Sequence, residues 1–360
     1  MEETVKDNII VVGGYGHVGR TLCEELGDRY PGKVYAAGRS MKRAEQLSAS
    51  SGGKVKPMQL DISKPADPNM LASAKLVIMC LDQTETDFVR ACLEAGTNYM
   101  DVSAQGDFLE QVERLAGVAE RNGATALLSI GLAPGLTNVL AKAAYGLLDE
   151  TTEIDISIML GLGDQHGKAA IEWTVDNLNA QFPVMLNNRQ SMVNSFEGGK
   201  RIDFGRSLGQ KKSYRFPFSD QQTLARTLSV PSVSTRLCFD SAAATALMAG
   251  LRSSGAVRLL KTGWIRSAAV AGFGKLRLGS EQFAVKVDAW GSKSGRESRA
   301  ECLLVGNNQS RMTALTAIFV ADALYRKEYP NGVFHIEQLF GISDMKNWIE
   351  REAELTINGE

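Results

Sequence analysis

The sequence predicts an α/β protein: an N-terminal domain with a doubly wound parallel sheet, followed by an α/β domain with a mainly antiparallel sheet. Over the first third of the chain, short β-rich runs alternate with helical patterns, as in a parallel sheet. From about residue 151 the strand candidates alternate in hydrophobicity instead, which is typical of an antiparallel sheet with one covered face. The length of 360 residues suits two domains of ordinary size.

The elements of the first domain follow one another as strand and helix. The first helix begins at about Val18, where Val18, Leu22 and Leu26 form one apolar stripe. A later helix ends at Asn122-Gly123, a usual C-terminal cap. The expected strands cover 8–12, 33–38, 75–81, 97–102 and 124–130, with a further strand ending in "QLDIS", and the later helices cover 86–96 and 107–123.

The second part contains longer strands. "EIDISIML" alternates in hydrophobicity, and "FAVKVDAWG" is expected to meet "RAECLLVG" across the turn "SKSG". A helix is expected over "KAAIEWTVDNLNAQF". One apolar face of this helix is formed by Ile171, Val175, Leu178 and Phe182. A final helix over 313–329 stops before Pro330, and an acidic tail ends the chain. We expect domain boundaries near 137 and 310.

The composition limits the classes of partner. The charge sum of 40 minus 41, or −1, provides no global basic field for nucleic acid or a membrane surface. No apolar run approaches the roughly 20 residues that span a bilayer. The acidic, polar opening argues against export, and the five scattered cysteines suggest a reducing compartment without a metal site. We therefore expect a cytoplasmic protein with a small-molecule partner.

The stretch "NIIVVGGYGHVGRTLCEEL" predicts a dinucleotide-binding turn. Gly14, Gly16 and Gly19 form G-x-G-x-x-G directly after a strand and at the start of a helix. The first glycine permits the tight turn, the second lets the backbone approach a pyrophosphate, and the third lets helix and strand pack closely. The alternative is a plain turn between strand and helix. The strand–turn–helix context favours a cofactor, with phosphate at the helix N-terminus.

The end of the second strand predicts which cofactor binds. An NAD site usually carries an acidic residue about 20 positions after the glycines. Here Gly38 stands in that place, and Arg39, Ser40 and Arg43 follow. Cations in place of a carboxylate suit a 2′-phosphate, so we predict NADP(H). A solvated basic start of a helix is the alternative for Arg43 and Lys42.

Further contacts are expected where other strands end, because ligands of doubly wound sheets bind at that edge. Asp61 and Ile62 end one strand and would lie beside the adenine, although a simple turn carboxylate fits Asp61 nearly as well. Pro134 and Gly135 form a rigid turn that can approach the nicotinamide. The cofactor set that we predict is Gly14, Tyr15, Gly16, His17, Val18, Gly19, Arg39, Ser40, Arg43, Asp61, Ile62, Leu81, Ser103 and Gly135.

Candidate catalytic residues lie in both parts of the chain. Asp101, at a strand end beside Ser103, is placed to hold or protonate a group near the nicotinamide; a cap and a turn residue are the alternatives. Trp173 lies off the apolar stripe of its helix and His166 in the turn before it, so the two are candidates for a cleft. Packing against the other domain is the alternative for Trp173. None of the three histidines has an evident triad or metal partner in the sequence, so hydrolysis and zinc catalysis find no support.

The whole pattern resembles the saccharopine dehydrogenase-like family of NADP-dependent oxidoreductases. The resemblance rests on "VVGGYGHVGR", "AGRS", "QLDIS", "YMDVSAQGDF", "LLSIGLAPGLTN" and "NGVFHIEQLFG". It implies a Rossmann domain over 1–137, a substrate and dimerisation domain over 138–310, and a helical segment over 311–360 that returns to the first domain. It also implies a homodimer, and hydride transfer between NADP(H) and a carbon bonded to nitrogen in an amino-acid-like substrate.

The chain departs from saccharopine-reducing members at several motif positions. They usually carry an acid before the proline-glycine turn and a histidine after it, where this chain has Ala133 and Thr137-Asn138. They also tend to have an aromatic residue where this chain has Ala104 and Gln105. These differences favour a substrate other than saccharopine. Reduction of a C=C or carbonyl group, and NADPH sensing without turnover, remain alternative functions.

Overall fold

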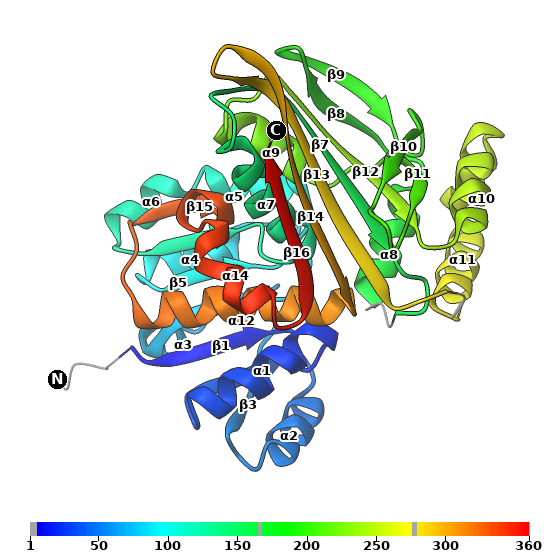
Figure 1. Cartoon of the computed structure of the whole chain (residues 1–360). Coiled ribbons are helices and arrows are strands. Elements are labelled where there is room, and N and C mark those ends of the chain that lie inside the picture. Colours follow the sequence, from blue (N-terminus) through cyan, green and yellow to red (C-terminus); the bar gives the residue numbers. More distant parts are fainter. Residues whose placement is uncertain (1–5, 165–167, 276–278, 360) are drawn as a thin grey trace. The chain divides into compact units, whose positions relative to one another are not determined.

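The computed structural model describes residues 6–164, 168–275 and 279–359 (Figure 1). They form two compact units. Unit 1 comprises the chain up to Leu136 together with Arg311–Leu339, and unit 2 comprises Thr137–Ser310 together with the chain from Phe340 onward.

Unit 1 is built on a seven-stranded sheet in which every pair of neighbours is parallel, as predicted. The strand order is β15-β6-β5-β4-β1-β2-β3. The chain runs outward from β1 first through β2 and β3 and then, on the other side, through β4, β5 and β6, so the order reverses beside β1. The strands are β1 (Asn8–Val12), β2 (Val34–Gly38), β3 (Val55–Gln59), β4 (Ala74–Met79), β5 (Asn98–Asp101), β6 (Thr125–Leu128) and β15 (Gly332–His335).

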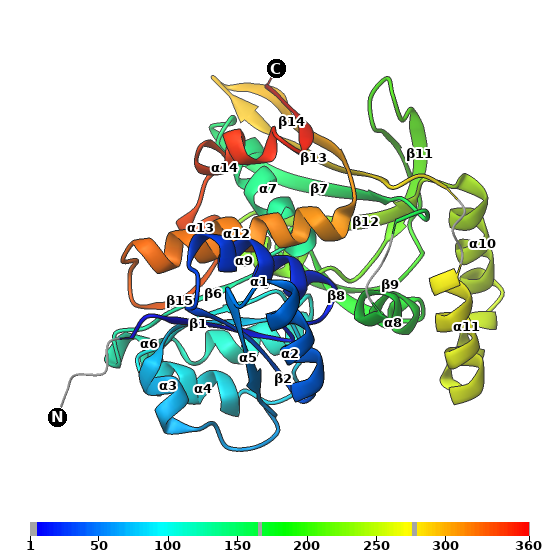
Figure 2. The ribbon, with the colours of Figure 1, turned by 90° about the horizontal axis from the view of Figure 1, so that it is seen from below.

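Helices connect the strands of unit 1 and bury one apolar stripe each. In the first helix, Leu22 and Leu26 of the expected stripe are buried, and Val18 is half-buried. Figure 2 shows the same elements after a quarter turn. The helices are α1 (His17–Arg29), α2 (Met41–Ser50), α3 (Pro68–Ser73), α4 (Asp87–Glu94), α5 (Gly106–Glu113), α6 (Ala116–Arg121), α12 (Gln309–Arg326, of which all but the first two residues belong to unit 1) and α13 (Ile336–Leu339). The segment η1 (Leu132–Leu136) is a turn with non-helical backbone at its three central residues.

The expected single helix over 107–123 is two helices, α5 and α6. The step falls at Arg114 and Leu115, where Leu115 takes a non-helical conformation before α6. Leu115 is only 3% exposed and belongs to the apolar core of unit 1. The step therefore serves packing, a tertiary effect that helical periodicity alone does not reveal.

Unit 2 is built on a mixed sheet of mainly antiparallel strands, as predicted. Its main path is β10-β11-β12-β7-β13-β14-β16, and β8 and β9 form a hairpin that joins at β12. One pair, β12 with β7, is parallel. The strands are β7 (Glu150–Leu160), β8 (Gln181–Leu186), β9 (Arg189–Asn194), β10 (Lys200–Asp203), β11 (Gln210–Arg215), β12 (Ser232–Phe239), β13 (Gln282–Lys293), β14 (Arg296–Asn307) and β16 (Ala353–Gly359).

Helices pack on this sheet. The first of them, α7 (Thr137–Tyr145), packs on the central strands β7, β13 and β14. No helix of the described residues has the length and apolar character needed to cross a membrane. The helices are α7 (Thr137–Tyr145), α8 (Lys168–Asn177), α9 (Asp220–Thr227), α10 (Ala242–Ser253), η2 (Ala256–Lys261), α11 (Gly263–Lys275) and α14 (Ile342–Ile349).

Two expectations are corrected in this part of the chain. Phe182 does not continue the face of α8, because the helix ends at Asn177 and Phe182 lies in β8, paired with Val193 of β9. The segment 311–360 does not return to the first domain as a whole. Its first part supplies β15 to the sheet of unit 1, whereas its last strand, β16, pairs with β14 of unit 2.

Candidate functional site

In the glycine turn between β1 and α1, the backbone leaves no room for a side chain at Gly14 or Gly19. A Cβ atom on Gly14 would lie 2.8 Å from the carbonyl oxygen of Val11 and 2.9 Å from the Cα of Ala36. A Cβ atom on Gly19 would overlap the carbonyl oxygen of Gly13. Helix and strand therefore pack backbone to backbone, as the G-x-G-x-x-G spacing predicts.

The N-terminus of α1 can bind an anion. The cap residue Gly16 has extended backbone and makes no side-chain cap hydrogen bond, and the first turn holds no acidic residue. The N–H groups of His17, Val18 and Gly19 thus have no side-chain cap, and the helix dipole adds positive potential there. Backbone N–H groups beside a glycine-rich turn fit the pyrophosphate of a dinucleotide.

The Tyr15 side chain fills the space at the end of β2. Its hydroxyl accepts a hydrogen bond from the Ser40 N–H at 2.9 Å, and Arg43 lies over the ring, with its Cζ 4.5 Å from the ring centre. A Cβ atom on Gly38 would come within 2.7 Å of Tyr15 Cζ. An acidic side chain at position 38 is therefore sterically excluded while Tyr15 keeps this place.

Basic and hydroxyl groups stand around this strand end instead. Arg39 and Arg43 are exposed, and Arg43 also donates from Nη2 to the Tyr15 carbonyl oxygen at 3.2 Å. The Ser40 hydroxyl caps α2 by accepting from the Arg43 N–H at 3.4 Å. Guanidinium groups beside a helix N-terminus suit the 2′-phosphate of NADP(H).

Three other predicted cofactor residues lie near this edge of the sheet or next to it in sequence. Asp61 forms a local turn, since its Oδ1 accepts from the Ser63 N–H and hydroxyl, and these hydrogen bonds lower the pKa of Asp61. Ile62 packs against the core of unit 1. Leu81 is 42% exposed and lies against the glycine turn, so that a Cβ on Gly13 would meet its Cδ2 at 2.8 Å. Leu81 thus offers an apolar surface beside the pyrophosphate site.

Asp101 ends β5 as a fully buried carboxyl. Its Oδ2 accepts from the Tyr99 hydroxyl at 2.5 Å and from Gln83 Nε2 at 3.2 Å, and its Oδ1 accepts from the Ser103 N–H at 2.6 Å. Burial raises the pKa of Asp101 to about 7, although the hydrogen bonds from Tyr99, Ser103 and Gln83 oppose this shift. A buried carboxyl that titrates near neutral pH is typical of functional sites, and also of structural networks.

The partners of Asp101 were not predicted from the sequence. Tyr99 precedes it by two positions on one strand, so the alternation of side chains along a strand could have placed both on the same face. Gln83 follows β4, and its approach depends on β4 and β5 being neighbours. The Gln83 amide also donates to the Tyr99 hydroxyl at 2.8 Å, which closes a three-membered network.

The other two predicted residues of this region are buried. Ser103 is 6% exposed, and its hydroxyl accepts from the Gln105 N–H at 3.3 Å, so it serves the turn that leads into α5. Gly135 has a φ of 138°, which favours glycine, and a Cβ there would lie 3.2 Å from the Ser129 carbonyl oxygen. The turn of Gly135 therefore folds tightly back on the end of β6.

A buried histidine network was not predicted from the sequence, in which none of the three histidines has an evident triad or metal partner. His335 Nε2 lies 2.9 Å from Glu113 Oε1, and Nδ1 lies 2.8 Å from the Ser129 hydroxyl. Because a carboxylate only accepts, Nε2 donates to Glu113, and in the neutral ring Nδ1 accepts from Ser129. Ser129 is completely buried. These hydrogen bonds therefore connect α5, β15 and the end of β6. Because Ser129 is buried, its hydroxyl is not accessible as a nucleophile for hydrolysis.

Replacing His335 by alanine is expected to lower the free energy of unfolding by about 2–3 kcal/mol, because both hydrogen bonds are lost and the Ser129 hydroxyl is left buried without its partner. Urea denaturation of the single and double variants with Ser129→Ala should give a coupling of about 1 kcal/mol. His17→Ala, at an exposed histidine, is the matched control and should change stability by less than about 0.5 kcal/mol. Unchanged stability of His335→Ala, together with a coupling energy of zero, would contradict a stabilising role of these hydrogen bonds.

Of the two candidates from the second part of the chain, Trp173 lies within the described residues. Trp173 is partly buried and packs on aromatic rings of its own unit, with ring centres 5.4 Å from Phe216 and 5.2 Å from Phe218. His166 lies outside the described residues. Among the side chains that are described, no group of His, Cys, Asp and Glu could hold a metal ion.

Comparison with known proteins agrees with this geometry. Residues 9–127 match the family described as saccharopine dehydrogenase NADP binding domain. No curated protein sequence matches the chain. A solved structure of apo saccharopine dehydrogenase (L-Glu forming) from Saccharomyces cerevisiae is 12% identical and has a TM-score of 0.72, covering 98% of this chain and 100% of that chain. This similarity extends the shared fold over both units.

Two further solved structures have lower scores. A DAP dehydrogenase from C. glutamicum in complex with DAP is 12% identical, covers 95% of this chain and 99% of that chain, and has a TM-score of 0.46. An engineered D-amino acid dehydrogenase bound to NADP⁺ is 13% identical, covers 95% of this chain and 99% of that chain, and has a TM-score of 0.49.

Proposed function

We propose that the chain belongs to the saccharopine dehydrogenase-like family of NADP-dependent oxidoreductases, because residues 9–127 match the NADP binding domain of that family. We further propose that it transfers a hydride between NADP(H) and the carbon of a C–N bond in a small amino-acid-like substrate. The observation that carries the proposal is the glycine turn with an N-terminus of α1 that no side chain caps, next to a β2 end that excludes an acidic residue. When bound, NADP(H) would accept or supply the hydride.

The residues of unit 1 have separate roles in this proposal. The first-turn N–H groups of α1 bind the pyrophosphate, and Arg39, Ser40 and Arg43 bind the 2′-phosphate. Leu81 covers the glycine turn on its exposed side. Each role concerns affinity and orientation, which are the contributions a protein makes when the cofactor carries the redox chemistry.

Asp101 is proposed as a positioning residue. Both its carboxyl oxygens are occupied by protein donors and its side chain has no exposed surface, so it acts through the backbone that it holds, that of Ser103. This backbone lies at the carboxyl end of β5, the edge where doubly wound sheets bind their ligands. The proton for the substrate nitrogen is not assigned to Asp101.

Replacing Arg39 by aspartate is expected to weaken NADPH binding about 10- to 100-fold and to leave NADH binding unchanged, because a charge-assisted hydrogen bond to the 2′-phosphate is replaced by repulsion. Titration of protein fluorescence with each nucleotide measures both affinities. Arg90→Asp, the same charge change at an exposed position of α4, is the matched control and should affect neither. Equal wild-type affinity for NADH and NADPH, unchanged in Arg39→Asp, would contradict the assignment.

The proposed reaction is tested by nicotinamide absorbance. The full chain with NADPH is mixed with a panel of keto acid and amine pairs that form imines, and we expect oxidation of NADPH with at least one pair. NADPH consumption with a carbonyl or C=C substrate alone would replace C–N chemistry by the corresponding reduction. Tight NADPH binding without turnover on any substrate would favour a sensing role instead.

A further inference from the structure

The helices α10 and α11 of unit 2 expose apolar faces. In α10 only Thr245 is buried, and the exposed positions Ala243, Ala246, Leu247 and Gly250 follow the spacing of one helical face. Leu247 is 57% exposed. A surface helix normally presents charged and polar side chains to water, so this distribution is inverted.

Helix α11 also exposes an uncharged face to water. On α11 the exposed positions Trp264, Ser267, Ala268 and Ala271 again share one face and carry no charge. Trp264 is 74% exposed, and Leu259 of the connecting η2 is 57% exposed. Figures 1 and 2 both show α10 and α11 next to each other at one edge of unit 2. Exposed apolar groups in such number mark an interaction surface.

The charged residues of the segment that forms these faces are all basic. The segment 242–275 contains five Lys and Arg residues and no Asp or Glu. Arg258 and Lys261 of η2 are exposed. Arg266 is paired with Asp176 of α8, and Arg252 lies 3.6 Å from Glu197, so those two cations are compensated. Two exposed basic side chains thus stand between two apolar faces.

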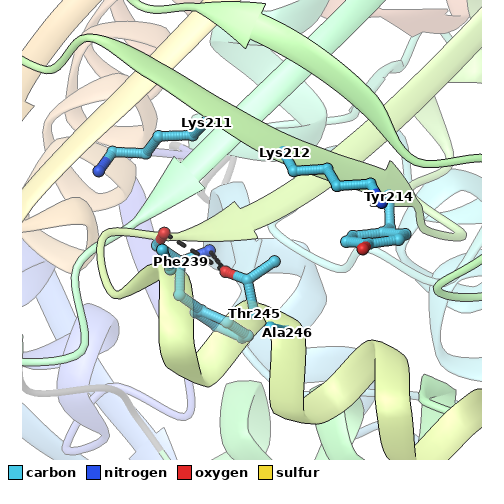
Figure 3. A pocket seen from close by; sticks show the side chains of 7 residues that line it. Lys211, Lys212, Tyr214, Phe239, Thr245 and Ala246 are labelled. Carbon is cyan, nitrogen blue, oxygen red and sulfur yellow. Dashed lines mark hydrogen bonds between the residues drawn. The ribbon is translucent and has the colours of Figure 1, made fainter.

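A small pocket continues the surface beside α10 (Figure 3). It has a volume of about 70 Å³ and is lined by Phe239, Ala242 and Ala246, with Lys211 and Lys212 of β11 at its side. The Lys211 ammonium donates to the Asp240 carbonyl oxygen at 3.0 Å, and that of Lys212 lies 5.2 Å from the centre of the Tyr214 ring. Cations and apolar surface are therefore combined here as well.

We propose that α10, η2 and α11 form a docking surface for the anionic face of a lipid bilayer. Exposed Trp and Leu insert at the boundary between headgroups and acyl chains, and flanking Lys and Arg are attracted to anionic headgroups. A second copy of the chain fits less well. In a two-fold interface, Arg258 and Lys261 of one copy would face the segment 242–275 of the other copy, and this segment contains no Asp or Glu. A homodimer would use another surface.

The whole-chain charge of −1 does not oppose this proposal. A net charge averages over the surface, whereas attraction to a bilayer acts within a Debye length of the side chains that approach it, roughly 8–10 Å at physiological salt. The binding is peripheral, and it is independent of the proposed hydride transfer.

The test is co-sedimentation of the full chain with vesicles. We expect binding to equimolar phosphatidylcholine and phosphatidylglycerol, weak binding to phosphatidylcholine alone, and weaker binding at high salt. Leu259→Ser with Trp264→Ser should reduce binding at least about tenfold. Arg258→Glu with Lys261→Glu should reduce it at least roughly fivefold for each position. Met192→Ser, at an equally exposed apolar residue of β9, is the matched control and should bind like the wild type.

All variants should unfold in urea as the wild type does, which shows that they are folded. Failure of the wild type to bind the mixed vesicles, or unchanged binding by both double variants, would overturn the proposal. So would a wild-type dimer in sedimentation velocity that Leu259→Ser with Trp264→Ser converts to a monomer, since a second copy would then cover these faces.

Discussion

Replacing Gly19 by alanine is expected to abolish measurable NADPH binding and to lower the free energy of unfolding by about 2–3 kcal/mol. The added Cβ would overlap the Gly13 carbonyl oxygen, which is backbone and cannot turn aside. Relief requires α1 to move away from the turn, and this movement displaces the first-turn N–H groups from the pyrophosphate. Calorimetric titration with NADPH and urea denaturation measure the two effects.

Gly117→Ala is the matched control for this experiment. Gly117 lies in α6, where an added Cβ would meet only the flexible end of Arg121 at 3.4 Å. Alanine is the better helix former by about 1 kcal/mol, so this variant should be as stable as the wild type or more stable, with unchanged NADPH binding. Normal NADPH affinity in Gly19→Ala would show that the turn is not the pyrophosphate site.

The second large effect concerns pH and Asp101. Burial raises the pKa of this carboxyl from 3.8 to about 7 in the folded chain. The folded state therefore holds the proton more tightly than the unfolded state, so the stabilising contribution is complete below about pH 4 and is lost as the pH rises through about 7. Between about pH 5 and about pH 8 the wild type should lose about 3 kcal/mol of unfolding free energy relative to Asp101→Asn.

Asparagine resembles the protonated carboxyl in shape but cannot ionise, so the difference between the two chains isolates this one group. Denaturation in urea at the two pH values measures it. Asp87→Asn, at an exposed carboxyl of α4, should follow the wild type at both pH values. A wild type that gains stability relative to Asp101→Asn as the pH rises would show that hydrogen bonding, not burial, governs Asp101.

The parts of the fold and site that the sequence predicted are local. The strand, the glycine turn and α1 are contiguous, and each glycine has a steric reason that depends on residues close in the chain or on the adjacent strand. The absence of an acid at Gly38 could likewise be recognised from the sequence. The physical reason for the missing acid is that the Tyr15 side chain occupies the space beside Gly38. Only the three-dimensional structure shows this, because it brings the glycine turn next to the end of β2.

The parts that were not predicted depend on strands brought together from distant positions. His335 is 206 residues from Ser129 and 222 from Glu113, and these groups meet because β15 joins the sheet in parallel beside β6. The local sequence around His335 does not indicate that β15 pairs with β6. Trp173 shows another difficulty, because an aromatic residue off the apolar stripe of its helix fits a cleft and packing equally, and the sequence does not reveal that Phe216 and Phe218 contact it.

We propose that the turn after β1 and the basic end of β2 together bind NADP(H). Calorimetric titration of the full wild-type chain with NADPH and with NADH tests it most directly. We expect one site per chain and an affinity for NADPH at least about tenfold higher than for NADH, because the 2′-phosphate of NADPH makes a charge-assisted contact. Equal affinities, or tighter binding of NADH, would contradict it.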